Sequence, residues 1–149
     1  MSVNDICNHN VATIDASSGM IEAAKRMRDT HVGDLIVTEN REGRIVPIGI
    51  LTDRDIVIEV VAKGVDPNQV TVGDAMSTEL LSVREDNGIE YALREIQRMG
   101  VRRVPVVNEK GELSGVLAID DVLDHLAIQL NHIAGAIRIE RQKETRTRP

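Results

Sequence analysis

The stretch that decides the fold is Gly49-Ile50-Leu51-Thr52-Asp53-Arg54-Asp55-Ile56-Val57, and a weaker copy of it occupies residues 115–123. Each copy has a glycine, a short apolar run typical of a β-strand, and an acidic cluster that opens an apolar helix. Gly49 and Gly115 lie 66 positions apart, whereas Val32 and Val101 lie 69 positions apart. A nearly constant offset indicates an internal repeat, with three extra residues in the hairpin turn of the first copy.

The apolar pattern predicts the order strand, helix, strand, strand, helix in both copies. Asn87 and Glu90 have the spacing of a helix capping box, and Glu109-Lys110-Gly111 is typical of a turn. Two such units predict an α/β (α+β) fold in which pseudo-symmetric repeats pack sheet to sheet around a common core. The elements are expected over residues 11–14, 19–30, 35–37, 45–51 and 53–63, and again over 80–83, 87–96, 104–107, 113–117 and 120–141.

The composition limits the functions that the chain can have. It has 149 residues, a net charge of −6 and one aromatic residue, Tyr91, which disfavours nucleic-acid binding by charge or by base stacking. Cys7 is the only cysteine, so no intrachain disulfide is expected. Because the N-terminus lacks the pattern of a signal peptide and no apolar run could span a bilayer, we expect a cytoplasmic protein without membrane contact.

The last predicted helix is longer than one repeat needs. An apolar stripe runs along it in steps of three and four residues, formed by Leu123, Leu126, Leu130, Ile133 and Ile137. Part of this stripe should cover the core of the chain, and the rest should meet another chain. Residues 138–149 carry five basic and two acidic side chains, so we expect a frayed basic tail there.

The motif of residues 49–55, Gly-apolar-apolar-Thr-x-x-Asp, resembles that of the cystathionine β-synthase (CBS) domain, here as a tandem pair called a Bateman module. The resemblance implies one CBS domain over residues 4–66, a second over 70–130, and a C-terminal helix extension with a basic tail over 131–149. Residues 51–57 and the linker 64–67 are similar to those of stand-alone bacterial CBS proteins.

The family resemblance implies a regulatory, ligand-sensing function. Such a module binds AMP, ADP, ATP, S-adenosylmethionine or NAD in crevices between the repeats, with or without Mg²⁺, and signals by a change of conformation or assembly. We expect a homodimer, an unidentified protein partner and no covalently bound cofactor. The alternative is a dimeric scaffold with vestigial nucleotide sites. No catalytic residues or metal ligands are expected, since no nucleophile–base pair and no metal-ligand spacing stands out.

The resemblance also assigns residues to two crevices. In the first, Thr52 and Asp55 would hold the ribose hydroxyls, although the same pair is also a plain helix capping box. The second crevice is expected to be weaker, because Ala118 stands where a hydroxyl is needed. The other residues assigned to the first crevice are Ile50, Asp34, Met76, Leu81 and Arg102, and those assigned to the second are Asp121, Val116, Arg103, Ala118 and Gly33.

Asp34 has a particular consequence for the ligand of the first crevice. It would lie near the phosphate position, with Arg102 reaching in from the other repeat. A carboxylate there repels a polyphosphate unless a cation neutralises the charge, so we expect Mg²⁺ to matter for ATP.

Overall fold

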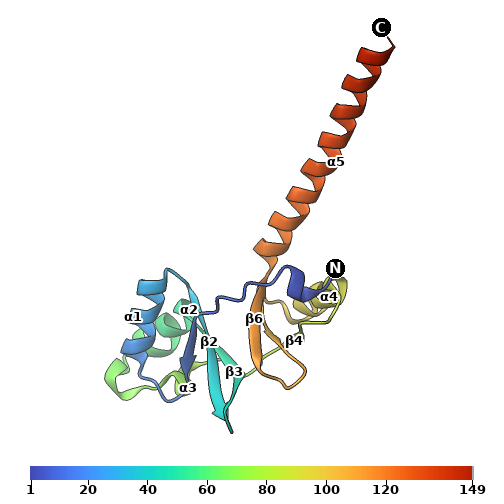
Figure 1. Cartoon of the computed structure of the whole chain (residues 1–149). Coiled ribbons are helices and arrows are strands. Elements are labelled where there is room, and N and C mark those ends of the chain that lie inside the picture. The colour runs from blue at the N-terminus through green and yellow to red at the C-terminus, as the bar shows by residue number, and fades with distance from the viewer. Residues whose placement is uncertain (149) are drawn as a thin grey trace.

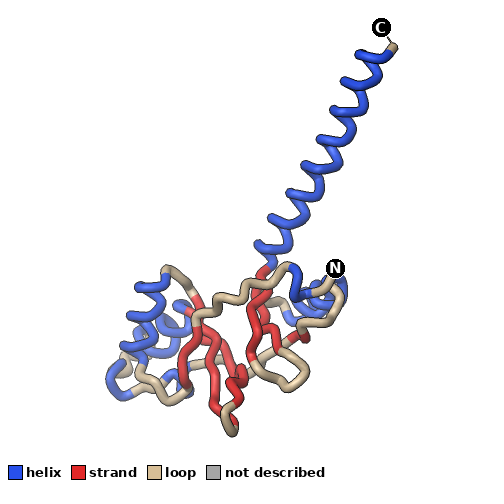
Figure 2. The backbone as a smooth tube through the Cα atoms, in the orientation of Figure 1, coloured by secondary structure: helices blue, strands red, loops and turns tan. Residues whose placement is uncertain are grey.

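The computed structural model describes residues 1–148, which form two similar lobes and one long projecting helix (Figures 1 and 2). One sheet has the strand order β1-β2-β3 and the other β4-β5-β6. In each sheet the first strand is parallel to the second, and the third is antiparallel to it. The predicted α/β class and tandem repeat are thus confirmed. The strands are β1 (Thr13–Asp15), β2 (Asp34–Arg41), β3 (Arg44–Thr52), β4 (Val83–Arg84), β5 (Arg103–Val107) and β6 (Leu113–Ala118).

The helices α1 (Met20–Thr30) and α4 (Ile89–Met99) connect the parallel strands of the two lobes. Each ends at a residue in the left-handed conformation, His31 (φ 56°) in the first lobe and Gly100 (φ 65°) in the second. These positions again differ by the repeat offset of 69. The remaining helical segments are η1 (Val3–Asp5), α2 (Asp53–Asp55), η2 (Ile56–Val61), η3 (Pro67–Gln69), α3 (Val72–Ala75) and α5 (Ile119–Thr147).

Two local predictions need correction. The helix expected over residues 53–63 is α-helical only in α2 and continues as the π-helix η2, in which the Ala62 N–H donates to the carbonyl of Val57 at 2.8 Å. The strand expected over residues 80–83 is reduced to β4. The first lobe therefore closes with a wider helical turn than the regular spacing suggested.

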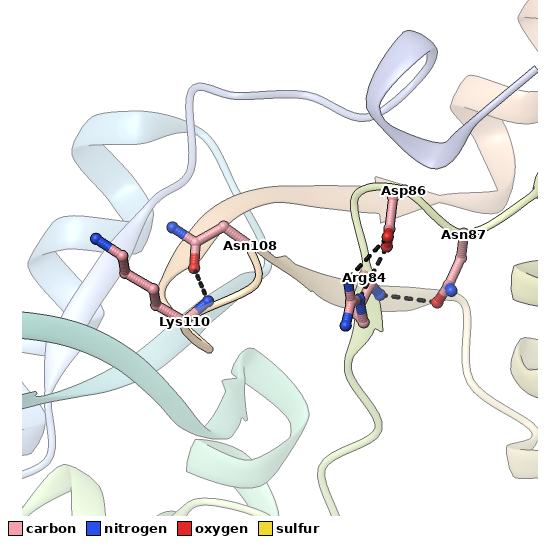
Figure 3. Close-up of polar contacts among 5 residues, drawn as sticks. All are labelled: Arg84, Asp86, Asn87, Asn108 and Lys110. Carbon is pink, nitrogen blue, oxygen red and sulfur yellow. Dashed lines mark hydrogen bonds and ion pairs between the residues drawn. The ribbon is translucent and has the colours of Figure 1, made fainter.

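The capping box predicted at Asn87 is wrong. The N-cap of α4 is Gly88, and Asn87 Oδ1 instead accepts from the Arg84 N–H at 2.9 Å, in a turn where Arg84 also pairs with Asp86 (Figure 3). The turn at Glu109-Lys110-Gly111 follows its prediction more closely. There the Lys110 N–H donates to Asn108 Oδ1 at 2.9 Å, as Figure 3 also shows.

The buried side chains form two clusters, one in each lobe, rather than the common core that the repeat predicted. Each cluster contains residues contributed by the opposite repeat. Val3 and Cys7 belong to the cluster of the second lobe, and Val72 belongs to that of the first. In Figure 1 the N-terminal segment crosses from β1 to the lobe that holds α4 and β6. The lobes are therefore tied together by an exchange of segments.

This exchange explains the glycine that opens each copy of the motif. The crossing segments pair with β3 and β6 through the bridges Ile50↔Ser77 and Asn8↔Val116. A Cβ atom at Gly49 would lie 2.8 Å from the Ser77 carbonyl oxygen, and one at Gly115 would lie 3.0 Å from the Asn8 carbonyl oxygen. Only a residue without a side chain allows this approach of two backbones.

The last helix, α5, projects far from the two lobes as a single rod (Figure 1). Val122 is its one buried residue, and the helix continues to Thr147. The expectation that it ends near residue 141, in a frayed tail, is therefore wrong. Among the described residues no helix, α5 included, combines bilayer-spanning length with a sufficiently apolar sequence.

Candidate functional site

A cleft of about 660 Å³ lies between the lobes, and its volume is typical of small-molecule sites. The first lobe contributes the start of β2, the end of β3 and the start of α2. The second contributes the start of β5 and of α5, and the segment after α3 completes the wall. The lining residues are Gly33, Asp34, Ile36, Ile50, Thr52, Asp53, Arg54, Asp55, Ser77, Glu79, Val101, Arg102, Arg103 and Asp120.

Thr52 and Asp55 line the cleft and form a reciprocal capping box at the N-terminus of α2. The Thr52 N–H donates to Asp55 Oδ2 at 2.9 Å, and the Asp55 N–H donates to Thr52 Oγ1 at 3.1 Å. The box fixes both side chains, yet it does not use Asp55 Oδ1 or the hydroxyl hydrogen of Thr52. One acceptor and one donor are thus held in place beside the cleft.

Two ion pairs are formed by residues that line the cleft. Arg103 Nη1 lies 3.1 Å from Asp34 Oδ1, and this ion pair joins the two lobes. Both side chains are partly shielded from solvent. Arg102 Nη2 lies 3.0 Å from Asp120 Oδ1, within the second lobe and in a more exposed position. The resemblance assigned Arg103 to the second crevice, whereas the structure places it beside the first-crevice residue Asp34.

The cleft carries more negative than positive charge. Its apolar lining residues are Ile36, Ile50 and Val101. An apolar ring could contact these aliphatic groups, while the net negative charge of the lining repels highly charged anions. The charged lining residues are the carboxylates Asp34, Asp53, Asp55, Glu79 and Asp120 and the guanidinium groups Arg54, Arg102 and Arg103, giving a formal net charge of −2.

Two residues assigned to the first crevice do not line the cleft. Met76 packs against the core of the first lobe, and Leu81 packs against that of the second. Ser77 and Glu79, from the same segment, line the cleft instead. Sequence reasoning missed Ser77 because its pairing with Ile50 is a long-range contact that residue spacing does not show.

The residues assigned to the second crevice are not brought together in this cleft. Gly33 lines it with Arg103, but Asp121, Val116 and Ala118 do not. Ala118 is almost fully buried at the N-cap of α5 and provides no side-chain cap. The role of these three residues stays a prediction.

Cys7 lies in the core of the second lobe rather than in an open site. Burial, and secondarily the charges of Glu85 and Asp121, raise the pKa of its thiol. Its Sγ is 3.8 Å from His9 Nε2, and His9 Nδ1 is 2.9 Å from the Ser114 carbonyl oxygen. Within residues 1–148, no three potential ligands gather as a metal site would require.

The CBS domain family model matches this chain twice, over residues 3–62 and 72–128. The CBS domain-containing protein YhcV of Bacillus subtilis is 36% identical over 121 residues, which cover 81% of this chain and 82% of YhcV. Protein MK0525 of Methanopyrus kandleri is 32% identical over 83% of this chain. The match covers 61% of MK0525, so this chain spans less than two thirds of that relative.

Solved structures share the fold. The crystal structure of Hypoxic Response Protein I with two coordinated zinc ions has a TM-score of 0.73 and 33% identity, covering 84% of this chain and 98% of that chain. The CBS domain pair of protein MJ0100, in complex with 5′-methylthioadenosine and S-adenosyl-L-methionine, has a TM-score of 0.72 and 21% identity. That match covers 87% of this chain and 98% of the other.

Proposed function

The chain belongs to the CBS domain family, and on that premise we propose that it is a regulatory module that senses an adenosyl ligand in the cleft between its lobes. The observation that carries the proposal is the box of Thr52 and Asp55. A carboxylate can accept hydrogen bonds from both hydroxyls of a ribose, and the capping box holds Asp55 in place for this before any ligand arrives.

The adenine is proposed to lie against the aliphatic residues of the cleft lining. Ile36, Ile50 and Val101 offer apolar contact to a ring without any aromatic partner. The adenosyl class is supported by the CBS domain pair of MJ0100, which shares the fold and is complexed with two adenosyl compounds. The match to ribose and base therefore rests on both the lining chemistry and a structural neighbour.

The charge of the cleft favours ligands of low negative charge. A phosphate group would have to take Arg103 from Asp34, or bring a cation that neutralises the surrounding carboxylates. We therefore expect 5′-methylthioadenosine or S-adenosylmethionine to bind more tightly than ADP, ATP or NAD. Mg²⁺ should improve the binding of ATP more than that of AMP.

The signal is proposed to be a population shift between two tilts of the lobes. The Arg103–Asp34 pair joins the lobes inside the cleft, so a ligand that contacts either residue acts on the link between them. The protein would work without catalysis, as a homodimer in the cytoplasm, and would pass the change to a protein partner.

The test is a thermal-shift screen of 5′-methylthioadenosine, S-adenosylmethionine, AMP, ADP, ATP and NAD, each with and without Mg²⁺. A one-site ligand at 100 times its Kd should raise the unfolding free energy by about 2.7 kcal/mol. Asp55→Ala should abolish the shift. The matched control is Asp74→Ala, which breaks the equivalent capping box of Thr71 and Asp74 at α3, outside the cleft lining, and should keep it.

A scaffold without a ligand is the second candidate, favoured by the pairing of Arg103 with Asp34 and by the missing hydroxyl at Ala118. It predicts that none of the six compounds changes the melting temperature while the chain still forms oligomers. A shift that survives in Asp55→Ala would reject the ribose assignment but not ligand sensing itself.

A further inference from the structure

The helix α5 leaves the lobes almost without tertiary packing. It has 29 residues and one buried side chain, Val122, which lies in its first turn. Beyond Val122, large apolar side chains remain exposed along the apolar stripe defined by residues 123, 126, 130, 133 and 137. Their exposed fractions are 58% for Leu123, 47% for Leu126, 66% for Leu130, 59% for Ile133 and 47% for Ile137.

A stripe of this kind suits one particular partner. Its steps of three and four residues form the narrow seam of a coiled coil, which another helix covers better than a flat surface does. Most of the stability of a helix in a protein comes from packing of its apolar face. The rod in Figure 1 has no such packing over most of its length, so a second helix is the missing element.

The charges along α5 indicate which helix is its partner and whether the two helices are parallel or antiparallel. Its first turns carry Asp120, Asp121 and Asp124, whereas its last turns, over residues 138–147, carry four basic and two acidic side chains. Two parallel copies would align these equal charges. Two antiparallel copies would place the acidic end of each helix beside the basic end of the other.

We propose that α5 pairs in an antiparallel coiled coil with α5 of a second copy of this chain, centred on Leu130. This centre places Leu130 opposite its counterpart and Leu123 of each helix opposite Ile137 of the other, with Leu126 and Ile133 of the two helices offset by one residue. Arg138 then comes level with Val122 of the second copy, between Asp120 and Asp124, while Glu140 comes level with Asp120. Residues 142–147 extend past the start of the second helix, so Arg138 and Arg141 supply the basic charge beside its first turns. The inference rests on the homodimer in the proposed function and does not depend on the ligand.

Disulfide cross-linking tests the direction of the pair. The full-length chain carries Cys7→Ala, with Leu123→Cys in one preparation and Ile137→Cys in another. The two positions are 14 residues, about 21 Å, apart on one helix, and a disulfide needs Cα atoms within about 7 Å. Antiparallel pairing predicts a cross-linked dimer only when the two preparations are mixed. Cross-linking within each separate preparation means parallel helices and overturns the proposal.

A charge in the seam tests whether α5 holds the dimer at all. Leu130→Asp should turn the dimer into a monomer in light scattering. Ile128→Asp should not, because Ile128 is similarly exposed, at 52%, but lies on the opposite face of α5. The proposal is overturned if the wild-type chain is a monomer, or if both variants remain dimers to the same extent. The apolar stripe of α5 would then be covered by a helix of another protein. Ligand binding, measured by thermal shift, should persist in the monomer. Failure of the α5 pairing can therefore be told apart from failure of the proposed ligand binding.

Discussion

Thr52 and Ala118 hold equivalent positions in the two repeats, and the backbone treats them alike. Their φ and ψ angles are −105° and 160° for Thr52, and −109° and 148° for Ala118. Each precedes a helix that has an aspartate three residues later, Asp55 or Asp121. With the hydroxyl, α2 has a complete capping box, and without it α5 has no side-chain cap.

This difference predicts a stabilising substitution. Ala118→Thr should give α5 the cap that α2 already has and raise the unfolding free energy by about 1 kcal/mol, because the hydroxyl satisfies a free N–H at the start of the helix. Urea denaturation measures the effect. Since Ala118 is 7% exposed, Ala118→Ser serves as the smaller variant, and a loss of stability in both would contradict the prediction.

Residue-level chemistry was only partly predictable from the sequence. The family resemblance assigned Thr52, Asp55, Ile50, Asp34 and Arg102 to the first crevice, and all five line one cleft. It could not show that Arg103 pairs with Asp34, because that distance depends on how the two lobes are set against each other. Whether these residues bind a ligand stays a prediction.

Among the elements, β3 and β6 each lie against the backbone of a crossing segment, and the sequence shows this close approach only as a glycine. The crossing segment passes so close to β3 that a methyl group at Gly49 would also come within 2.7 Å of Met76 Sδ. The thioether could move aside, but the carbonyl of Ser77 is part of the paired backbone.

Gly49→Ala should therefore lower the unfolding free energy by about 1–3 kcal/mol, as overpacking does. Gly19→Ala is the control, since a Cβ there meets nothing within 4 Å, although it lies just before α1. Chemical denaturation compares the two variants. Equal stability of both would mean that the contact between β3 and the crossing segment relaxes freely.

Periodicity predicted α1, α4 and the paired strands because their apolar spacing reflects local backbone geometry. It failed where a side chain found a different partner, as Asn87 did in closing a turn on Arg84. It also failed at η2, where a regular apolar run adopts a wider helical turn. Local competition between hydrogen-bond partners is not visible in spacing.

At the scale of the whole molecule, the exchanged segments make each lobe depend on the other half of the chain. Val3 and Val72 occupy equivalent repeat positions, and both are fully buried in the core of the opposite lobe. The sequence predicted one common core, because a repeat pattern does not show which copy covers which sheet.

This exchange predicts crossed effects of two matched substitutions. Val3→Ala and Val72→Ala should each lower the unfolding free energy by about 2 kcal/mol, from lost burial and a small cavity. Hydrogen exchange should quicken in α4 for Val3→Ala and in α1 for Val72→Ala. If hydrogen exchange instead quickened in α1 for Val3→Ala and in α4 for Val72→Ala, the crossing of segments between the lobes would be contradicted.

The central claim is that the cleft recognises the ribose of an adenosyl ligand through Asp55. Its most direct test is a calorimetric titration of wild type and Asp55→Ala with 5′-methylthioadenosine and with its 2′-deoxy analogue. Wild type should bind the deoxy analogue at least about tenfold more weakly, because one hydrogen bond to a charged group is lost. In Asp55→Ala the two compounds should bind equally weakly. Equal binding of both compounds to wild type, or no binding of either, would contradict the account.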